Sequence, residues 1–144
     1  NDVPVLVNTP VLDFTHFVVF TQSSLVEQTT PIAFLVFDAT ATASGIVFVD
    51  QDLDEHDLGG TILWQPPAAA ERVSAYAVYF SGDRRAPERS ALGDDVLIGT
   101  NLALVPPETP KHGYTDILVY SKSSLTEQST PASAPLADEV ASVS

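Results

Sequence analysis

The sequence predicts an all-β protein, made of antiparallel β-sandwich repeats. Short runs of apolar, β-branched and aromatic residues recur along the chain, with turn signals about every eight to twelve residues. No stretch has sustained helical periodicity. The third observation is an internal repeat of one hundred residues. We expect about seven short strands in each repeat.

The repeat is clearest in the stretch FTHFVVFTQSSLVEQTTP (14–31), which recurs one hundred positions later as YTDILVYSKSSLTEQSTP, with nine of eighteen residues identical. A chain of 144 residues therefore holds about one and a half repeats. We expect residues 1–40 to be the C-terminal half of one repeat, residues 41–138 to be a complete β-sandwich, and residues 139–144 to start the next. The chain then belongs to a longer tandem array.

The strongest strand signals lie within the repeated stretch and just after it. Residues 17–20 and 117–120 are continuous apolar runs, which predicts central strands buried on both faces. Residues 32–37 predict a further strand. Their counterparts, 132–137, are less apolar and contain Pro135, which favours an edge or frayed strand.

The other elements follow from short apolar runs and turn residues. Residues 1–10 and 101–110 each predict a short strand closed by a Pro-containing turn, and 38–44 form the junction between repeats. The pair Gly59-Gly60 predicts a turn. Further strands are expected at 46–49, 61–64, 73–80 and 96–98, with a long polar loop at 81–95.

Half a sandwich leaves an apolar face bare and strand edges open. In a parent chain the missing strands for residues 1–40 lie upstream. In an isolated segment they come from a neighbouring molecule or from the chain's own early strands in a permuted pairing. We therefore expect strand exchange or partial disorder in residues 1–40.

One family resemblance rests on the run TILWQPP followed by YAVYF. It resembles the B and C strands of a fibronectin type III domain, with an inward Trp64, the pair Pro66-Pro67, and Tyr76 and Val78. Tyr114 is similar to the tyrosine that begins strand F of that family. The repeat also resembles uncharacterised modules of about a hundred residues in large protist proteins. The resemblance implies an immunoglobulin-like sandwich in which residues 1–40 are strands E, F and G.

Composition limits the possible partners. The net charge is −13, from six basic and nineteen acidic residues, so the long-range field repels phosphate. We therefore expect no nucleic-acid partner. No apolar run reaches the roughly 20 residues that span a bilayer, so no membrane insertion is expected. The chain has no cysteine, which excludes disulfides and thiol chemistry.

The acidic run DQDLDEHD (50–57) is the main candidate for a site. Asp50, Asp52, Asp54 and Asp57 are the candidate ligands of a calcium ion, because hard Ca²⁺ binds carboxylate oxygens. The run is not an EF-hand, since its sixth position is Glu55 where that loop needs glycine. Near a repeat junction, bound calcium would stiffen the array. The alternative is a solvated acidic turn.

Other polar features carry weaker hypotheses. The three histidines, His16, His56 and His112, form no recognisable catalytic pattern, and we expect no enzyme activity. The Ser-rich loops 23–31 and 123–131 are either a repeated binding surface, with Glu27 and Glu127 as its charges, or identical turns whose leucines plug the sandwich end. The basic residues Arg84, Arg85 and Arg89 either lie in a solvated loop or contact the acidic run of a neighbour.

Together these features predict a non-enzymatic structural or adhesive module of a long tandem-repeat protein, extracellular or on the cell surface, that assembles into a filament. Its expected partners are neighbouring repeats of the same chain or identical chains, joined by strand complementation. The alternative is a ligand-binding β-sandwich module, for calcium or glycan, attached to a larger protein. A third possibility is an accessory domain of an enzyme whose catalytic part lies elsewhere.

Overall fold

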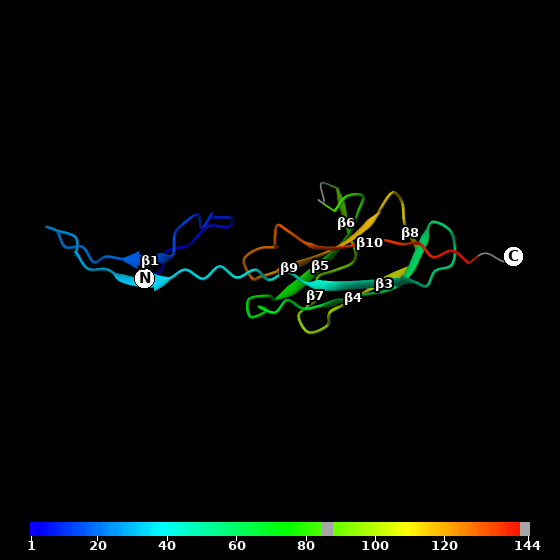
Figure 1. Cartoon of the computed structure of the whole chain (residues 1–144), viewed down its shortest axis with the longest axis horizontal. Helices are drawn as coiled ribbons and strands as arrows, with labels where there is room; N and C mark the ends of the chain where they lie inside the picture. The colour runs from blue at the N-terminus through cyan, green and yellow to red at the C-terminus, as the bar shows by residue number, and fades with distance from the viewer. Residues whose placement is uncertain (85–87, 142–144) are drawn as a thin grey trace. The chain divides into compact units, whose positions relative to one another are not determined.

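The computed structural model describes residues 1–84 and 88–141, which form ten strands and no helix (Figure 1). The chain divides into two compact units, residues 1–40 (unit 1) and 41–144 (unit 2). Every strand pairing among the described residues is antiparallel. The predicted all-β, antiparallel fold class is therefore confirmed. The prediction that residues 139–144 start a further repeat stays a prediction, and 142–144 lie outside the described residues.

The first sheet of unit 2 has the order β3-β4-β8, formed by β3 (Ser44–Asp50), β4 (Asp57–Gln65) and β8 (Leu102–Pro110). Ile62 of β4 pairs with Phe48 on one side and Ala103 on the other. Strand β8 continues through Pro106 and Pro107, which an edge strand tolerates because one side of it needs no ladder hydrogen bonds.

The second sheet of unit 2 has the order β10-β9-β5-β6, and β7 also pairs with β5. It consists of β5 (Ala75–Ser81), β6 (Arg89–Ala91), β7 (Val96–Leu97), β9 (Asp116–Lys122) and β10 (Ala132–Pro135). Strand β9 lies between β5 and β10, so its backbone is paired on both sides. Strand β10 lies at the edge, as its proline predicted.

The two sheets of unit 2 share one hydrophobic core, an arrangement consistent with a β-sandwich. The rings of Trp64 from β4 and Tyr76 from β5 meet edge to face at 5.4 Å, across the space between the sheets. Ile117, Leu118, Val119 and Tyr120 of β9 are at most 3% exposed, so β9 is buried on both faces as predicted. The core is built from Leu58, Ile62, Trp64, Tyr76, Val78, Phe80, Val105, Ile117 and Val119, among others.

Unit 1 contains a single strand pair, β1 (His16–Val19) with β2 (Ile32–Leu35). We call residues 16–35 the first hairpin and residues 116–135, with β9 and β10, the second hairpin. The two have the same register: His16 is opposite Leu35 as Asp116 is opposite Pro135.

Burial on both faces is wrong for the first copy of this strand. Phe17, Val18, Val19 and Phe20 are 40–66% exposed. The physical reason is that unit 1 contains no strand equivalent to β5 and no second sheet. The strand expected in residues 1–10 is also not formed, whereas its counterpart forms β8 on the edge of β4.

The turn predicted at Gly59-Gly60 is wrong, because β4 runs through both glycines. Gly60 has φ +141°, and a Cβ there would lie 2.8 Å from the carbonyl oxygen of Val49 on β3. The glycine is needed for close approach of two strands inside the sheet. The predicted polar loop 81–95 also contains the short strand β6, which pairs with the end of β5.

Candidate functional site

Asp50, the first predicted calcium ligand, is buried at the end of β3 and serves as a hydrogen-bond acceptor for the backbone. Its Oδ1 accepts from the amides of Gly59 at 2.9 Å and Asp52 at 3.1 Å. Its Oδ2 accepts from the amide of Glu139 at 3.2 Å. Both carboxylate oxygens accept backbone hydrogen bonds, so Asp50 fixes the loop conformation. It is not a member of the acidic cluster described next.

Three carboxylates meet beside this loop: Asp52, Asp54 and Glu108, which we call the acidic cluster. One oxygen of each lies within 4.8 Å of the others. Asp52 Oδ2 also accepts a 2.7 Å hydrogen bond from the amide of Glu108, and Asp52 Oδ1 accepts one from the amide of Asp54 at 3.3 Å. The charges of Asp52, Asp54 and Asp57 raise the pKa of Glu108 above its ordinary value.

Sequence reasoning missed Glu108, which lies more than fifty residues from the acidic run. It is brought there by an irregularity in the β4–β8 ladder, where the pairing shifts between Leu58 opposite Thr109 and Gly60 opposite Val105. The extra residues of β8 bulge, and Glu108 takes a left-handed conformation with φ 60°. The repeat gave no signal for it either, since the equivalent position is Asn8, which also has a left-handed φ, of 61°.

Asp57, the fourth predicted ligand, begins β4 opposite Pro110 and is not a member of the acidic cluster. It acts on the cluster only through its charge, which contributes to the raised pKa of Glu108. His56 Nε2 lies 3.5 Å from Glu55 Oε1, and both side chains are largely exposed. The structure therefore brings together two of the four predicted ligands and adds one.

The acidic loop lies against the end of the described chain. The amide of His56 donates to Asp138 Oδ2 at 3.1 Å, and the amide of Ala141 donates to the carbonyl of Leu53 at 3.3 Å. The hydrogen bond from Glu139 to Asp50 lies in the same place. The acidic cluster thus borders the segment that follows the sandwich.

The chemistry of the acidic cluster suits a hard cation. Three carboxylate oxygens at this spacing repel one another, and a divalent cation among them would neutralise that repulsion. The surface around them is hollowed, and backbone oxygens and water would complete the roughly six to eight oxygens that Ca²⁺ binds. The residues that line this hollow are Gln51, Asp52, Leu53, Asp54, Gly59, Gly60, Pro107 and Glu108.

The Ser-rich loops form the same turn in both units. The hydroxyl of Ser23 accepts hydrogen bonds from the amides of Leu25 and Val26, and Ser123 does the same for Leu125 and Thr126. The expectation that the leucines plug the sandwich end is wrong, because both are exposed. The serine hydroxyl fixes the turn, so the leucines are not needed for its closure.

Glu127 of the second loop is held by residues of β5 and β6. Its Oε1 lies 2.6 Å from Arg89 Nη2, and its Oε2 accepts a 2.8 Å hydrogen bond from the hydroxyl of Tyr79. The guanidinium of Arg89 lies over the rings of Tyr79 and Tyr120, at 4.2 Å and 4.3 Å. Burial, with the neighbouring carboxylate, raises the pKa of Tyr79.

The basic residues of the predicted polar loop are therefore used within unit 2. Arg89 pairs with Glu127, and Arg84 Nε lies 2.9 Å from Asp116 Oδ1. Arg85 lies outside the described residues. Two of the three arginines thus have carboxylate partners in their own unit, and the contact with a neighbour's acidic run stays a prediction.

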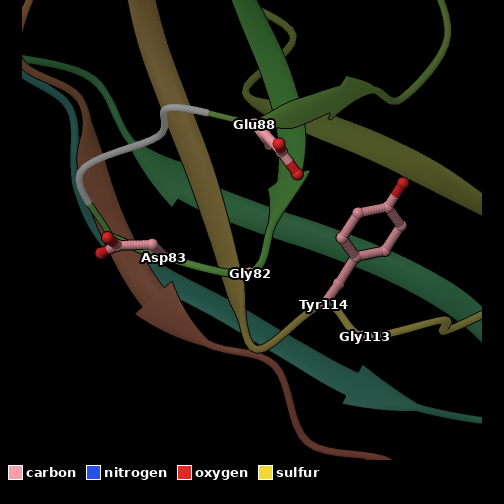
Figure 2. A pocket seen from close by; sticks show the side chains of 5 residues that line it. All are labelled: Gly82, Asp83, Glu88, Gly113 and Tyr114. Carbon is pink, nitrogen blue, oxygen red and sulfur yellow. The ribbon is translucent and has the colours of Figure 1, made fainter.

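A second pocket lies at the start of the loop after β5 (Figure 2). Figure 2 shows Asp83, Glu88 and Tyr114 around it, and their side chains do not converge on one point. Asp83 and Glu88 flank residues 85–87, which lie outside the described part of the chain. We place no site in this pocket.

Comparison with protein-family models, with curated proteins and with solved structures finds no match to this chain. The part of the chain that the structure describes contains no helix long and apolar enough to cross a membrane. Any functional proposal therefore depends on the geometry of the chain itself.

Proposed function

We propose that the chain is a non-enzymatic structural or adhesive module of a fibronectin type III-like tandem array, extracellular or on the cell surface. The observation that carries this proposal is the first hairpin, which has the strand register and the serine turn of the second hairpin one hundred residues away. Such conservation of geometry between two copies is expected of repeats that each build the same unit. The array would be able to form a filament.

The strand order of unit 2 supports the fibronectin type III-like part of the proposal. Strands β3, β4 and β8 correspond to A, B and E of one sheet, and β5, β9 and β10 to C, F and G of the other. The buried Trp64 on β4 meets Tyr76 on β5, as the TILWQPP and YAVYF resemblance requires. The net charge of −13, from nineteen acidic and six basic residues, suits a soluble extracellular array.

The test is electron microscopy of the natural polypeptide, captured with an antibody against unit 2. We expect globules of roughly 35 to 45 Å repeating along a thread, a size that follows from strand rise and domain dimensions. Denaturing electrophoresis of the same sample should give a polypeptide much larger than 15.3 kDa. A single isolated globule would contradict the array.

A second candidate function is calcium binding at the module junction, which the acidic cluster favours over the glycan alternative. Asp52, Asp54 and Glu108 offer three oxygens to one cation, beside the chain segment that leaves the sandwich. A cation bound there would restrain the junction and stiffen an array.

Calorimetric titration with CaCl₂ tests this function. We expect binding heat and a rise in the melting temperature of unit 2, and loss of both in Glu108→Gln, which removes one ligand. Glu71→Gln, an exposed carboxylate in the turn before β5, is the matched control and should bind like the parent chain. No heat and no thermal shift in the parent chain would remove the calcium function.

A further inference from the structure

Unit 1, with the first hairpin, keeps an apolar inner face that none of its own elements covers. In unit 2, Ala103, Val105, Ile117 and Val119 are buried, and they pack into the shared core. The residues one hundred positions earlier are Val3, Val5, Phe17 and Val19, all apolar and all more than half exposed. Exposed apolar residues at these four core positions of the repeat indicate a surface that another element buries.

The open edge of β1 is equivalent to the edge of β9 that is paired in unit 2. In unit 2, β9 pairs with β5 over seven residues, with Val119 opposite Val78 and Ile117 opposite Phe80. The equivalent edge of β1 has no partner among the described residues, because β1 pairs with β2 alone. An unpaired edge next to an apolar face favours addition of a strand.

A charged residue points to the same missing element. Glu127 is held by Arg89 and Tyr79, which β5 and β6 supply. Glu27 occupies the equivalent place in the first hairpin, is exposed, and has no ion pair within the described residues. The element that covers the first hairpin is therefore expected to carry an arginine and a tyrosine at the positions of Arg89 and Tyr79.

We propose that residues 1–40 are an acceptor for a repeat segment equivalent to residues 41–100, the part of the repeat that carries β3 to β7. Its β5-type strand adds to β1 in the β5–β9 register, which sets Val19 opposite the residue equivalent to Val78. Its β4-type strand pairs with residues 2–10, which then form a β8-type strand. The source of the segment rests on the proposed function, since a tandem array supplies such segments.

A second identical chain cannot supply this segment without a loss of its own. Within the residues that the structure describes, each chain carries two hairpins and one set of strands β3 to β7. If the β5 of one chain covered the first hairpin of another, its own second hairpin would lose the partner that buries β9. Exchange between identical chains therefore leaves one hairpin per chain uncovered. A segment equivalent to residues 41–100 that has no hairpin of its own to cover would supply the missing strands.

A cross-linking experiment tests the register. A second copy of residues 41–100 is fused in front of Asn1, which keeps the spacing of one hundred residues. The chain has no cysteine, so Val19→Cys and, in the added copy, Val78→Cys form the only thiol pair. We expect near-complete disulfide formation, because directly opposed residues have the required spacing. The control pairs Val19→Cys with Tyr79→Cys in the added copy, whose side chain points to the other face, and should give only a trace.

Hydrogen exchange of the same chains without cysteines gives the second readout. The amides of residues 17–20 should exchange at least about a hundredfold more slowly in the extended chain than in the original one. If larger side chains overfill the new core, the variant with Phe17→Ile and Phe34→Ala, which copies the second hairpin, should restore protection.

The proposal is overturned if neither the extended chain nor this variant gives cross-linking above the control or slower exchange. It is also overturned if the original chain dimerises with residues 17–20 already protected, since the occupant is then a second copy. Neither outcome depends on the natural polypeptide seen by electron microscopy, so the array and the acceptor can fail separately.

Discussion

At the scale of single residues, the acidic run separates into two roles. Asp50 is buried, with both oxygens accepting backbone amides, while Asp52 and Asp54 lie nearer the surface with Glu108. A buried carboxylate is tolerated when hydrogen bonds replace the water that it loses. The alternating aspartates of the sequence therefore do not form one uniform site.

Asp50→Ala should destabilise unit 2, because the buried amide of Gly59 loses its acceptor. We expect a loss of about 1–3 kcal/mol in the free energy of unfolding. Urea denaturation followed by the fluorescence of Trp64, the single tryptophan, measures it. Glu55→Ala, an exposed change in the same loop but outside the acidic cluster, is the control. Equal midpoints for the two variants would show that Asp50 is no more than a surface charge.

Glu108 should give the acidic cluster a characteristic pH dependence. Its folded pKa is raised above the unfolded value, so its charge opposes folding above the folded pKa, and this penalty disappears as the pH falls below the unfolded pKa. Glu108→Gln should therefore melt at a higher temperature than the parent at neutral pH without calcium, and the difference should shrink on acidification.

Thermal melts of both chains between neutral pH and about pH 4, in the presence of a chelator, check this. Glu71→Gln should follow the parent at every pH. A difference between Glu108→Gln and the parent that stays constant, or that grows on acidification, would mean that the carboxyl of Glu108 is not in the repulsive cluster.

At the scale of elements, the β3–β4–β8 sheet shows how one strand sets the geometry of a site. Strand β4 passes through Gly59 and Gly60, and β8 bulges opposite them so that Glu108 reaches Asp52. A residue with a side chain at Gly60 would collide with the carbonyl of Val49 and would have to adopt a φ of +141°. The sheet and the acidic cluster therefore depend on the same glycine.

Gly60→Ala should cost about 1–3 kcal/mol from backbone strain alone, and more from the contact with Val49. Urea denaturation with Trp64 fluorescence gives the loss in stability. Gly113→Ala is the matched control, because a Cβ there meets nothing within 4 Å and the backbone is not left-handed. If both alanine variants unfold at the same midpoint, the close approach of β3 and β4 is not required.

At the scale of the whole molecule, the chain contains the same hairpin in two environments. Ile117 is fully buried between the sheets of unit 2, whereas Phe17, at the equivalent position of unit 1, is half exposed. The free energy that a side chain contributes depends on the water that folding removes from it. Two equivalent positions should therefore respond very differently to the same substitution.

Ile117→Ala should reduce the stability of unit 2 by about 2–5 kcal/mol, the range for large core residues cut to alanine. Phe17→Ala should leave that stability unchanged, because Trp64 and its surroundings belong to unit 2. The comparison uses urea unfolding at equal protein concentrations. A comparable loss of stability in both variants would mean that Phe17 is buried in solution. The apolar face of the first hairpin would then already be covered.

Local patterns in the sequence were sufficient for the fold class, the repeat and most strands. Runs such as 117–120 and 73–80 are apolar enough to predict strands, and Pro135 predicted the edge position of β10. Two of the four predicted ligands, Asp52 and Asp54, also lie in the acidic cluster, because both belong to the short loop between β3 and β4. Each of these features depends on residues that are close together in the sequence, so local patterns are enough to predict it.

Tertiary structure decided the remaining features, because each depends on residues distant in sequence. Glu108 reaches Asp52 because the register of the β4–β8 pairing shifts. The carboxylate of Asp50 accepts hydrogen bonds from the amides of Gly59 and Glu139. Gly60 lies where β4 approaches β3 closely. The sequence determined that the two hairpins are the same element. Only the structure shows that β1 still pairs with β2 while its apolar side chains stay exposed, because unit 1 has no second sheet and no β5-type strand to cover them.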